Sequence, residues 1–444
     1  MSTTVFVIIV VVFILGYCCI ALEHPLKINK SATALLLAVI LWSIYALFGG
    51  FHDSETLFTA LGEEIKLRPL IEHLGDTAEI LFFLLGAMTI VETVDKHGGF
   101  AIITDQIRTT NKRKLLWIIA IITFFMSAAL DNLTTSIVMV ALLRKLVEDK
   151  KDRWFFAGMV ILAANAGGAW SPIGDVTTIM LWIKGNITAS MIIKETFIPS
   201  LVSMVVPLAI ISLTMKGSVK RPAEKDSAVT LTASKLQSNI VFFLGVGSLL
   251  FTPIFKTITH LPPYMGILLG LGLIWVVTEI LHRHNADKYS RLNVSSILQK
   301  VDTPSVLFFL GILMAVACLQ DAGHLKLLAQ SLDSIGNIYV INVIIGALSS
   351  VVDNVPLVAA AMGMYPLAEV GHYAVDGAFW EMLAYCAGTG GSMLIIGSAA
   401  GVAVMGMEKI DFIWYLKKIS LWALLGYLAG AGTFYLMSHF LLHS

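Results

Sequence analysis

Charged residues are scarce in this chain of 444 residues. Asp, Glu, Lys and Arg make up 14% of it, whereas a soluble domain has about 25%. Hydrophobic residues make up 57%, and the mean hydropathy is +0.83. A soluble core of this size does not need so much apolar material, so we expect lipid to be the main solvent. The net charge of zero argues against nucleic acid as a partner.

Cysteine motifs and processing signals are also lacking. The four cysteines have neither zinc-ligand nor Cys-x-x-Cys spacing, and we read them as small buried hydrophobic residues: Cys18, Cys19, Cys318 and Cys386. The N-terminus has no basic stretch, no small-residue cleavage motif and no Arg- and Ser-rich transit sequence. Residues 4–22 are therefore predicted to be a retained first membrane span.

Apolar runs recur along the chain, and most have the length of about 20 residues that one crossing needs. They are residues 4–22, 31–50, 76–94, 115–143, 154–183, 197–215, 238–255, 261–281, 304–319, 338–366, 379–407 and 419–440. The runs 115–143 and 338–366 are too long for one helix, and each is interrupted by an Asp-Asn pair. We predict that these two runs are re-entrant hairpins.

The distribution of basic residues gives the orientation. With both hairpins re-entrant, 24 of the 30 Lys and Arg residues fall on one side of the membrane. Cytoplasmic segments are rich in Lys and Arg, so this side is predicted to be the cytoplasm. The model that follows has ten spans and both termini outside. The first hairpin enters from the cytoplasm, and the second enters from the outside.

The two halves of the chain resemble each other. The Asp-Thr string at 76–84, the pair Asp131-Asn132 and the glycines at 167, 168 and 174 each recur 222 to 226 residues later, in the same order. We therefore predict an all-α polytopic membrane protein built from two inverted-topology repeats of about five spans. The repeats are 1–222 and 238–444, joined by a cytoplasmic linker at 223–237. Each contains one hairpin and one broken helix, the latter at 154–183 and 379–407.

Polar residues inside these runs are the candidate site, because ionisable groups at membrane depth are costly and usually functional. Asp131 and Asp353 lie at the predicted hairpin tips, where irregular backbone is tolerated only if it lines a cavity or is buried in protein. The alternative is that each is an N-cap for the second arm of its hairpin. The two readings are compatible.

The first broken helix offers a set of hard oxygen ligands that would suit an alkali cation: Asn165, Ser171, Asp175, Thr177 and Thr178. The alternative is a packing hinge. The second broken helix is rich in glycine but has no carboxylate, and Ser398 aligns with Asp175. Its half is expected to bind through Ser349, Ser350, Asp353, Asn354, Ser392 and Ser398. Glu79 and Asp302, near span ends, are possible accessory acids or simple caps.

No Lys or Arg lies inside a predicted span, which favours a cation over a dicarboxylate as the substrate. This argument does not decide the matter, because the N-termini of half-helices can hold anions without basic residues. A buried carboxylate can bind either Na⁺ or a proton, and such competition would drive exchange. Asp131 and Asp175 are predicted to carry it, with neutral oxygens from Asn132 and Asn165.

The hairpin that begins Asp131-Asn132-Leu133-Thr134, the broken helix from Asn165 to Thr178 and the hairpin from Ser349 to Pro356 together resemble the NhaD-type Na⁺/H⁺ antiporters. These belong to a superfamily that also contains dicarboxylate and arsenite carriers. The resemblance implies exchange of Na⁺ and Li⁺ for H⁺, no cofactor, a bacterial inner membrane with periplasmic termini, a dimerising scaffold domain and elevator-like movement of a transport domain.

The resemblance also places ion-binding positions on this chain. They are Asp131, Asn132, Asn165, Asp175, Thr177, Thr178, Ser349 and Asn354, with Asp353 and Glu79 as contributors and Na⁺ itself at Asp131, Asn132, Asn165 and Asp175. Thr134 and Ser392 complete the predicted set. The chain departs from the family at Gly388 and Gly391, where serines are common, and this leaves Ser392 as the nearest hydroxyl.

Two other functions compete with that of an antiporter. A dicarboxylate or arsenite carrier would use the same fold. An intramembrane aspartyl protease would need two carboxyls that share a proton. Ile173-Gly174-Asp175 resembles part of a Gly-x-Gly-Asp signature, but Pro172 replaces the first glycine and no Tyr-Asp partner is present. We therefore expect a transporter rather than an enzyme.

Overall fold

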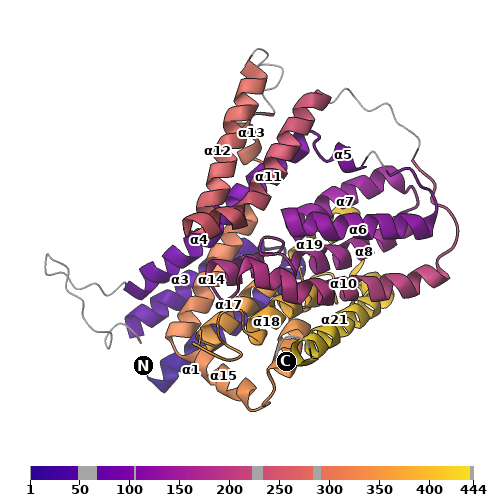
Figure 1. Cartoon of the computed structure of the whole chain (residues 1–444). Coiled ribbons are helices and arrows are strands. Elements are labelled where there is room, and N and C mark those ends of the chain that lie inside the picture. Colours follow the sequence, from indigo (N-terminus) through magenta and orange to yellow (C-terminus); the bar gives the residue numbers. More distant parts are fainter. Residues whose placement is uncertain (1, 49–67, 105–106, 223–233, 284–291, 441–444) are drawn as a thin grey trace.

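The computed structural model describes the chain except for residues 1, 49–67, 105–106, 223–233, 284–291 and 441–444. The described residues are helical almost throughout (Figure 1), and they form no strand beyond two isolated backbone bridges. The all-α prediction is confirmed. Most of the linker predicted at 223–237 lies outside the described residues.

Nine helices in the described part of the chain are long and apolar enough to cross a membrane. They are α1 (Thr3–Ala21), α3 (Lys30–Phe48), α4 (Arg68–Lys96), α6 (Lys112–Leu130), α10 (Ala189–Thr214), α11 (Lys235–Thr259), α12 (Pro263–His282), α14 (Thr303–Asp321) and α21 (Ser420–Phe440). Each coincides with one of the predicted apolar runs or, for α6, with the first arm of a predicted hairpin.

The remaining helices are shorter. They are α2 (Glu23–Leu26), α5 (Ala101–Thr104), α7 (Asn132–Leu146), α8 (Lys150–Gly168), α9 (Val176–Ile183), α13 (Val294–Leu298), α15 (His324–Asp333), α16 (Ile338–Leu348), α17 (Asn354–Met364), α18 (Ala378–Gly390), α19 (Ala399–Glu408) and α20 (Phe412–Lys418). Eight helices form four pairs, each broken where the sequence predicted: α6 with α7, α8 with α9, α16 with α17, and α18 with α19.

The helices separate into two packed groups (Figure 1). The first group is α1, α3, α4, α11, α12 and α14, which pack against one another. Two hydrogen bonds join α3 to the α14 segment, from the Ser31 hydroxyl to the Pro304 carbonyl (2.6 Å) and from the Trp42 indole to the Met314 carbonyl (2.8 Å). We call this group the outer helices. The second group, the core helices, contains α6 to α10 and α16 to α21.

The packing of the first half recurs in the second half. α6 and α7 both pack on α8, as α16 and α17 both pack on α18, and α4 packs on α12 as α14 packs on α3. The two halves meet at α10 and α21, which pack on each other. This is the pattern expected of a repeat, and the inversion of one copy relative to the other stays a prediction.

Glycines explain why the hairpin arms can lie so close to the broken helices. A Cβ on Gly167 of α8 would collide with the backbone carbonyl of Phe124 on α6. At the matching place in the second half, a Cβ on Gly390 of α18 would collide with the carbonyl of Gly346 on α16. Only glycine permits this backbone approach, and it occurs one turn or less from each helix break.

Several helices differ from the predictions. α4 begins at Arg68 rather than at residue 76, and α10 begins at Ala189 rather than at residue 197. The short helices α2, α5, α13, α15 and α20 were not predicted. α11 continues to Thr259 and so contains Lys256, which the apolar run 238–255 left out. The helices α10 and α11 are thus longer than the apolar runs that predicted them, and each contains a basic residue beyond its run, Lys194 in α10 and Lys256 in α11. An apolar window ends at the first charge, whereas a helix can extend until its cap.

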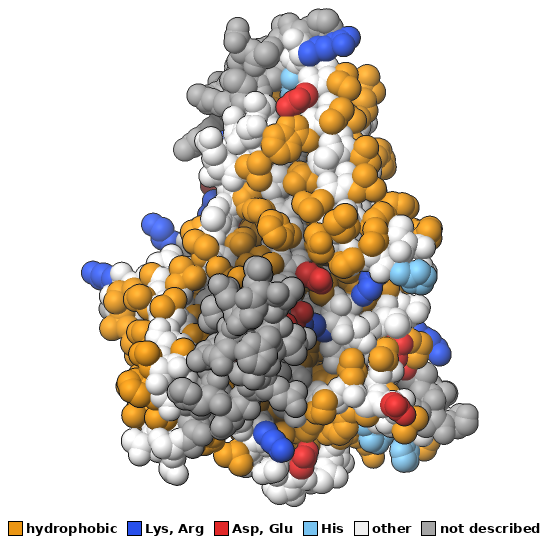
Figure 2. All heavy atoms as spheres, turned by 90° about the vertical axis from the view of Figure 1, so that its left-hand side faces the viewer, with side chains coloured by type: hydrophobic (Ala, Val, Ile, Leu, Met, Phe, Trp, Pro, Cys, Tyr) orange, Lys and Arg blue, Asp and Glu red, His pale blue; other side chains and the backbone are white. Residues whose placement is uncertain are grey.

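The surface carries the apolar content that a lipid-facing protein needs. Figure 2 shows hydrophobic side chains spread over the tall upper part of the molecule, which α11 and α12 form in Figure 1. On α12 they follow a stripe with helical spacing, in which each side chain is exposed: Leu269, Leu273, Val276 and Ile280. Such a stripe is typical of a helix that faces acyl chains.

Candidate functional site

Asp175 is the centre of the polar network among the core helices. It lies at the break between α8 and α9, caps α9, and is 1% exposed. One carboxylate oxygen accepts hydrogen bonds from the Thr177 backbone N–H (2.8 Å) and the Thr177 hydroxyl (2.8 Å). The Thr178 hydroxyl donates to the Asp175 carbonyl (2.9 Å). It also accepts from the Asp175 backbone N–H (3.3 Å), which completes a capping box. The broken helix therefore orients its own carboxylate.

Both hairpin tips reach this carboxylate. The Asn132 amide of the first tip donates to Asp175 Oδ2. The Asn354 amide of the second tip donates to Asp175 Oδ1 (3.2 Å) and Oδ2 (3.4 Å). The side chains of both asparagines are buried. The Asn of each Asp-Asn pair, rather than the Asp, thus contacts Asp175, and the Asn354 contact joins the two halves.

Asn165 is the second centre of the network. Its oxygen accepts from the Asn132 amide (3.1 Å), and its nitrogen donates to the hydroxyls of Ser392 (2.9 Å) and Ser398 (3.0 Å). All of these side chains are buried. The connected set therefore runs from Asp175 in the first broken helix to Ser398 in the second, and its polar atoms are oxygens and neutral amides.

Each of the four second half-helices begins with a side-chain cap. Asp131 caps α7, Asp175 caps α9, Asp353 caps α17 and Ser398 caps α19. The N-cap reading of Asp131 and Asp353 therefore describes their geometry, and the alignment of Ser398 with Asp175 gives two residues with the same local role. Four helix N-termini meet near one buried place, and their partial positive charge favours an anionic group such as Asp175.

Asp131 does not touch Asp175. Its two oxygens accept from the Thr134 N–H (2.7 Å) and the Thr134 hydroxyl (2.8 Å). Its backbone has φ of 108°, a strained value for a residue other than glycine. The side chain lines a cavity of about 10 Å³ against Phe83, Leu84 and other residues of α4. Of the four residues predicted to hold Na⁺, three are linked directly, and Asp131 faces the outer helices.

Asp353 also faces the outer helices, through different contacts. Its carboxylate lies 3.7 Å from Lys30 Nζ of α3, and its backbone N–H donates to the Tyr17 hydroxyl of α1 (3.1 Å). The Lys30 ammonium lies 4.4 Å from the centre of the Phe308 ring. Asp353 is therefore outside the connected network but next to it, since Asn354 contacts Asp175.

Three predicted hydroxyls hold backbone at the helix breaks. Ser171 donates to the Ala128 carbonyl (2.6 Å), Ser349 to the Ala387 carbonyl (2.9 Å) and Ser350 to the Ala347 carbonyl (2.7 Å). Their oxygens keep free lone pairs but have no side-chain partner in the network. In this conformation Ser171 and Ser349 fasten each hairpin to its broken helix, whereas the Ser350 bond stays within the second hairpin.

The two accessory acids lie elsewhere. Asp302 is exposed and caps α14, accepting from the Ser305 N–H (3.3 Å), as its capping alternative predicted. Glu79 lies on α4, where it interacts electrostatically with Asp76, Lys184 and Lys256. Neither belongs to the Asp175 network.

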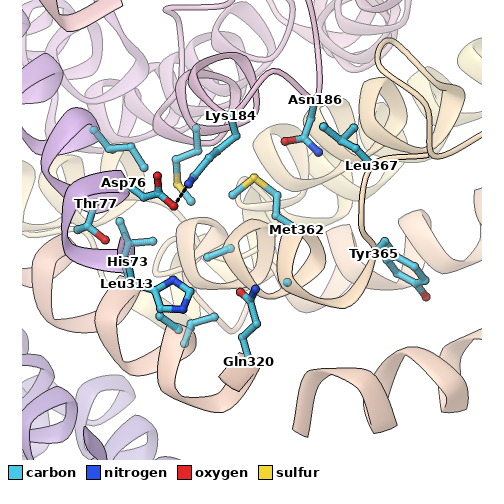
Figure 3. A pocket seen from close by; sticks show the side chains of 16 residues that line it. His73, Asp76, Thr77, Lys184, Asn186, Leu313, Gln320, Met362, Tyr365 and Leu367 are labelled. Carbon is cyan, nitrogen blue, oxygen red and sulfur yellow. Dashed lines mark ion pairs between the residues drawn. The ribbon is translucent and has the colours of Figure 1, made fainter. Parts of the chain in front are cut away.

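A cavity of about 280 Å³ lies between the outer helices α4 and α14 and the core helices α9 and α17 (Figure 3). Asp76 of α4 forms an ion pair with Lys184 at the end of α9 across it. His73 lies on the same wall and contacts Asp321 (3.0 Å). Lys256 of α11 donates to the Trp182 carbonyl of α9 (2.6 Å). The end of α9 is thus held to the outer helices at two points, by Asp76 through Lys184 and by Lys256.

Sequence reasoning missed Lys30, Tyr17 and Glu381. Lys30 and Tyr17 have no local signal, because their partner Asp353 is more than 300 residues away. Glu381 had a signal, since it is a carboxylate inside the run 379–407. The described residues contain no group of three or more His, Cys, Asp or Glu that could hold a metal ion.

A helical membrane fold in which two hairpins and two broken helices converge on one buried carboxylate defines a secondary transporter. A family model described as citrate transporter (CitMHS) matches residues 10–384. Two curated relatives add detail. The chain is 48% identical to sodium/proton antiporter 1 of Arabidopsis thaliana, over 95% of this chain and 71% of that one. It is 31% identical to the Na⁺/H⁺ antiporter NhaD of Vibrio cholerae, over 96% and 91%.

The chain therefore belongs to the citrate transporter family and, within it, to the NhaD-type Na⁺/H⁺ antiporters. The predicted resemblance and the expectation of a transporter rather than an enzyme are confirmed. Among solved structures, the YdaH transporter of Alcanivorax borkumensis superposes with a TM-score of 0.58 at 12% identity, covering 93% of this chain and 98% of that one. At that identity the likeness shows the fold alone.

Proposed function

We propose that this protein exchanges Na⁺ for H⁺ across a membrane and that Asp175 is the shared binding group. One observation carries the proposal: Asp175 is buried, and among the described residues the polar contacts of its carboxylate are amides, a hydroxyl and a backbone N–H. A buried carboxylate without a cationic partner is costly, so it takes up either a metal cation or a proton. Na⁺ and H⁺ then compete for one place, which is the condition for exchange.

The neutral partners suit a small hard cation. Carboxylate, amide and hydroxyl oxygens are the ligands that such ions prefer. Thr177 and Thr178 lie beside Asp175, and the amide oxygens of Asn132 and Asn165 can turn toward an ion that displaces the present hydrogen bonds. Transport of Li⁺ as well as Na⁺ is part of the proposal. Asp131, Thr134, Ser171, Ser349, Asp353, Asn354 and Ser392 would line the path or the second half of the site.

The movement we propose is of elevator type. The core helices hold the network, and the outer helices surround only part of it, so the core can move as one body against α4, α11 and α14. The outer helices would also form a homodimer. The membrane would be a bacterial inner membrane with both termini periplasmic, although the Arabidopsis relatives show that the family extends to plants.

The substrate is tested in everted membrane vesicles with an imposed pH gradient. Na⁺ and Li⁺ are expected to dissipate the gradient, while citrate, succinate and arsenite have no effect. The measurement with citrate matters because the matching family model is named for citrate transport. A gradient that responds to citrate, and to no alkali cation, would establish the carrier alternative instead.

The movement is tested by cross-linking the ion pair of Figure 3. In a chain without its native cysteines, Asp76→Cys with Lys184→Cys joins α4 to the end of α9. A short bifunctional thiol reagent is expected to stop exchange, and a reducible reagent should allow recovery. The matched control is Glu92→Cys with Lys96→Cys, an ion pair inside α4 (2.9 Å), whose cross-link should leave exchange intact. Full exchange after the first cross-link would rule out movement between these two groups.

A further inference from the structure

Glu381 is a buried carboxyl that the proposed exchange does not use. It lies in the first turn of α18, its side chain is 0% exposed, and neither of its oxygens has a hydrogen-bond donor among the described residues. An ionised carboxylate in such a place loses its hydration without compensation, at a cost of several kcal/mol. The charge must therefore be removed or balanced.

The nearest charges make the ionised form worse. Glu195 of α10, itself buried, and Asp376 in the turn before α18 both act electrostatically on Glu381. Asp376 is fixed by the N-cap of α10, since it accepts from the Thr188 N–H (2.5 Å) and the Thr188 hydroxyl (2.9 Å). Three carboxyls thus interact where the N-terminal parts of α10 and α18 meet.

No described cation on the surrounding helices balances Glu381. Of the helices packed on α18, α9, α16 and α17 contain no charged residue, and Lys194 of α10 is exposed. The charges of α8 lie in its first turn, where Arg153 pairs with Glu408. α21 contributes His439, in its last turn. Among the tyrosines of these helices and of α18, the hydroxyls of Tyr385 and Tyr427 donate to backbone carbonyls, and that of Tyr339 contacts the Ser438 hydroxyl.

We propose that Glu381 binds a proton in this conformation, and that Glu381 with Glu195 and Asp376 forms a second proton-binding site, separate from Asp175, at the contact between α10 and α18. The neutral carboxyl lets the two helices pack. Loss of the proton places like charges together and pushes α18 away from α10. Because α18 leads into the break that carries Ser392, the site connects proton concentration to the geometry around Asn165.

Infrared spectroscopy of the reconstituted full-length protein tests the bound proton. Glu381→Gln is expected to remove one carbonyl stretch of a protonated carboxyl at neutral pH. Glu369→Gln, at an exposed position in the segment before α18, is expected to remove none. Glu195→Gln keeps Glu381 but removes a like charge, so the band should disappear at lower pH than in the native protein. A Glu381→Gln spectrum that keeps the full protonated intensity would overturn the proposal.

The effect on transport rests on the proposed exchange, so it is measured separately. Gln at position 381 imitates the protonated form at every pH. At low pH the variant and the native protein should exchange equally, because both are neutral there. As the pH rises, Glu381 ionises only in the native protein, so the rate of the native protein is expected to fall at alkaline pH while that of the variant does not. If the exchange rates of the two proteins depend on pH in the same way at alkaline pH, Glu381 does not act on transport. If neither protein exchanges ions, the infrared result is unaffected.

Discussion

Asp175→Asn is expected to abolish Na⁺-dependent exchange while the protein still folds. Asn keeps the size of the side chain and is a good N-cap, so α9 should begin at the same place. What is lost is the charge. Two unit charges 4 Å apart interact by about 4 kcal/mol at an effective dielectric constant of about 20, which corresponds to about 1000-fold in affinity. The neutral variant also cannot release a proton in exchange for the cation.

The matched control is Asp149→Asn. Asp149 is also the N-cap of a helix, accepting from the Asp152 N–H (2.8 Å) at the start of α8, but it is exposed and far along α8 from the helix break. The same substitution should leave exchange close to that of the native protein. Direct Na⁺ binding, measured by calorimetry on purified protein, distinguishes a lost site from a blocked movement. Native Na⁺ affinity in Asp175→Asn would exclude Asp175 as the binding group.

The helix breaks were predictable from the sequence because their causes are local. A carboxylate or glycine inside an apolar run interrupts the helix, and Asp and Asn start the next one. Asp131, Asp175 and Asp353 therefore appear where the sequence placed them. The repeat could be predicted as well, because the motifs recur in register. Helix ends were less predictable: Lys256 ended the apolar run but not α11.

The partners of the site could not be predicted, because they come from helices far apart in the chain. The length of the run 338–366 and the Asp-Asn pair that interrupts it predict that Asp353 lies in a hairpin, but nothing near it in the sequence indicates Lys30 or Tyr17. The same holds within the network. Asp131 and Asp175 were expected to act side by side, whereas Asn132 and Asn354 make the contacts to Asp175 and both hairpin aspartates face the outer helices.

This arrangement suggests why each tip carries an Asp-Asn pair. The asparagine faces inward and joins the hairpin to Asp175, and the aspartate caps the helix and faces the outer helices. The second tip has a cation available in Lys30, while the described contacts of Asp131 include none. The two halves thus share a backbone arrangement but differ in charge. The first half has Asp175 where the second has Ser398, and Lys30 lies beside the tip of the second half.

Gly167→Ala is expected to disrupt the first hairpin and stop exchange. The added methyl group would meet the carbonyl of Phe124, and backbone cannot rotate away as a side chain can. Overpacking of this kind costs about 1–3 kcal/mol, and it moves α6 relative to α8, which carry the break at Asp131 and the amide of Asn165. Gly390→Ala should act in the same way through the carbonyl of Gly346.

The control for both is Gly247→Ala on α11, where an added Cβ meets nothing within 4 Å. There the change should raise stability by about 1 kcal/mol, since Ala is the better helix former. A Gly-to-Ala substitution is thus expected to lower the stability at Gly167 and to raise it at Gly247, which thermal unfolding of the purified protein can measure. If Gly167→Ala were as stable and active as Gly247→Ala, α6 and α8 could not lie in backbone contact, and the meeting of the hairpin tip with Asp175 would lose its support.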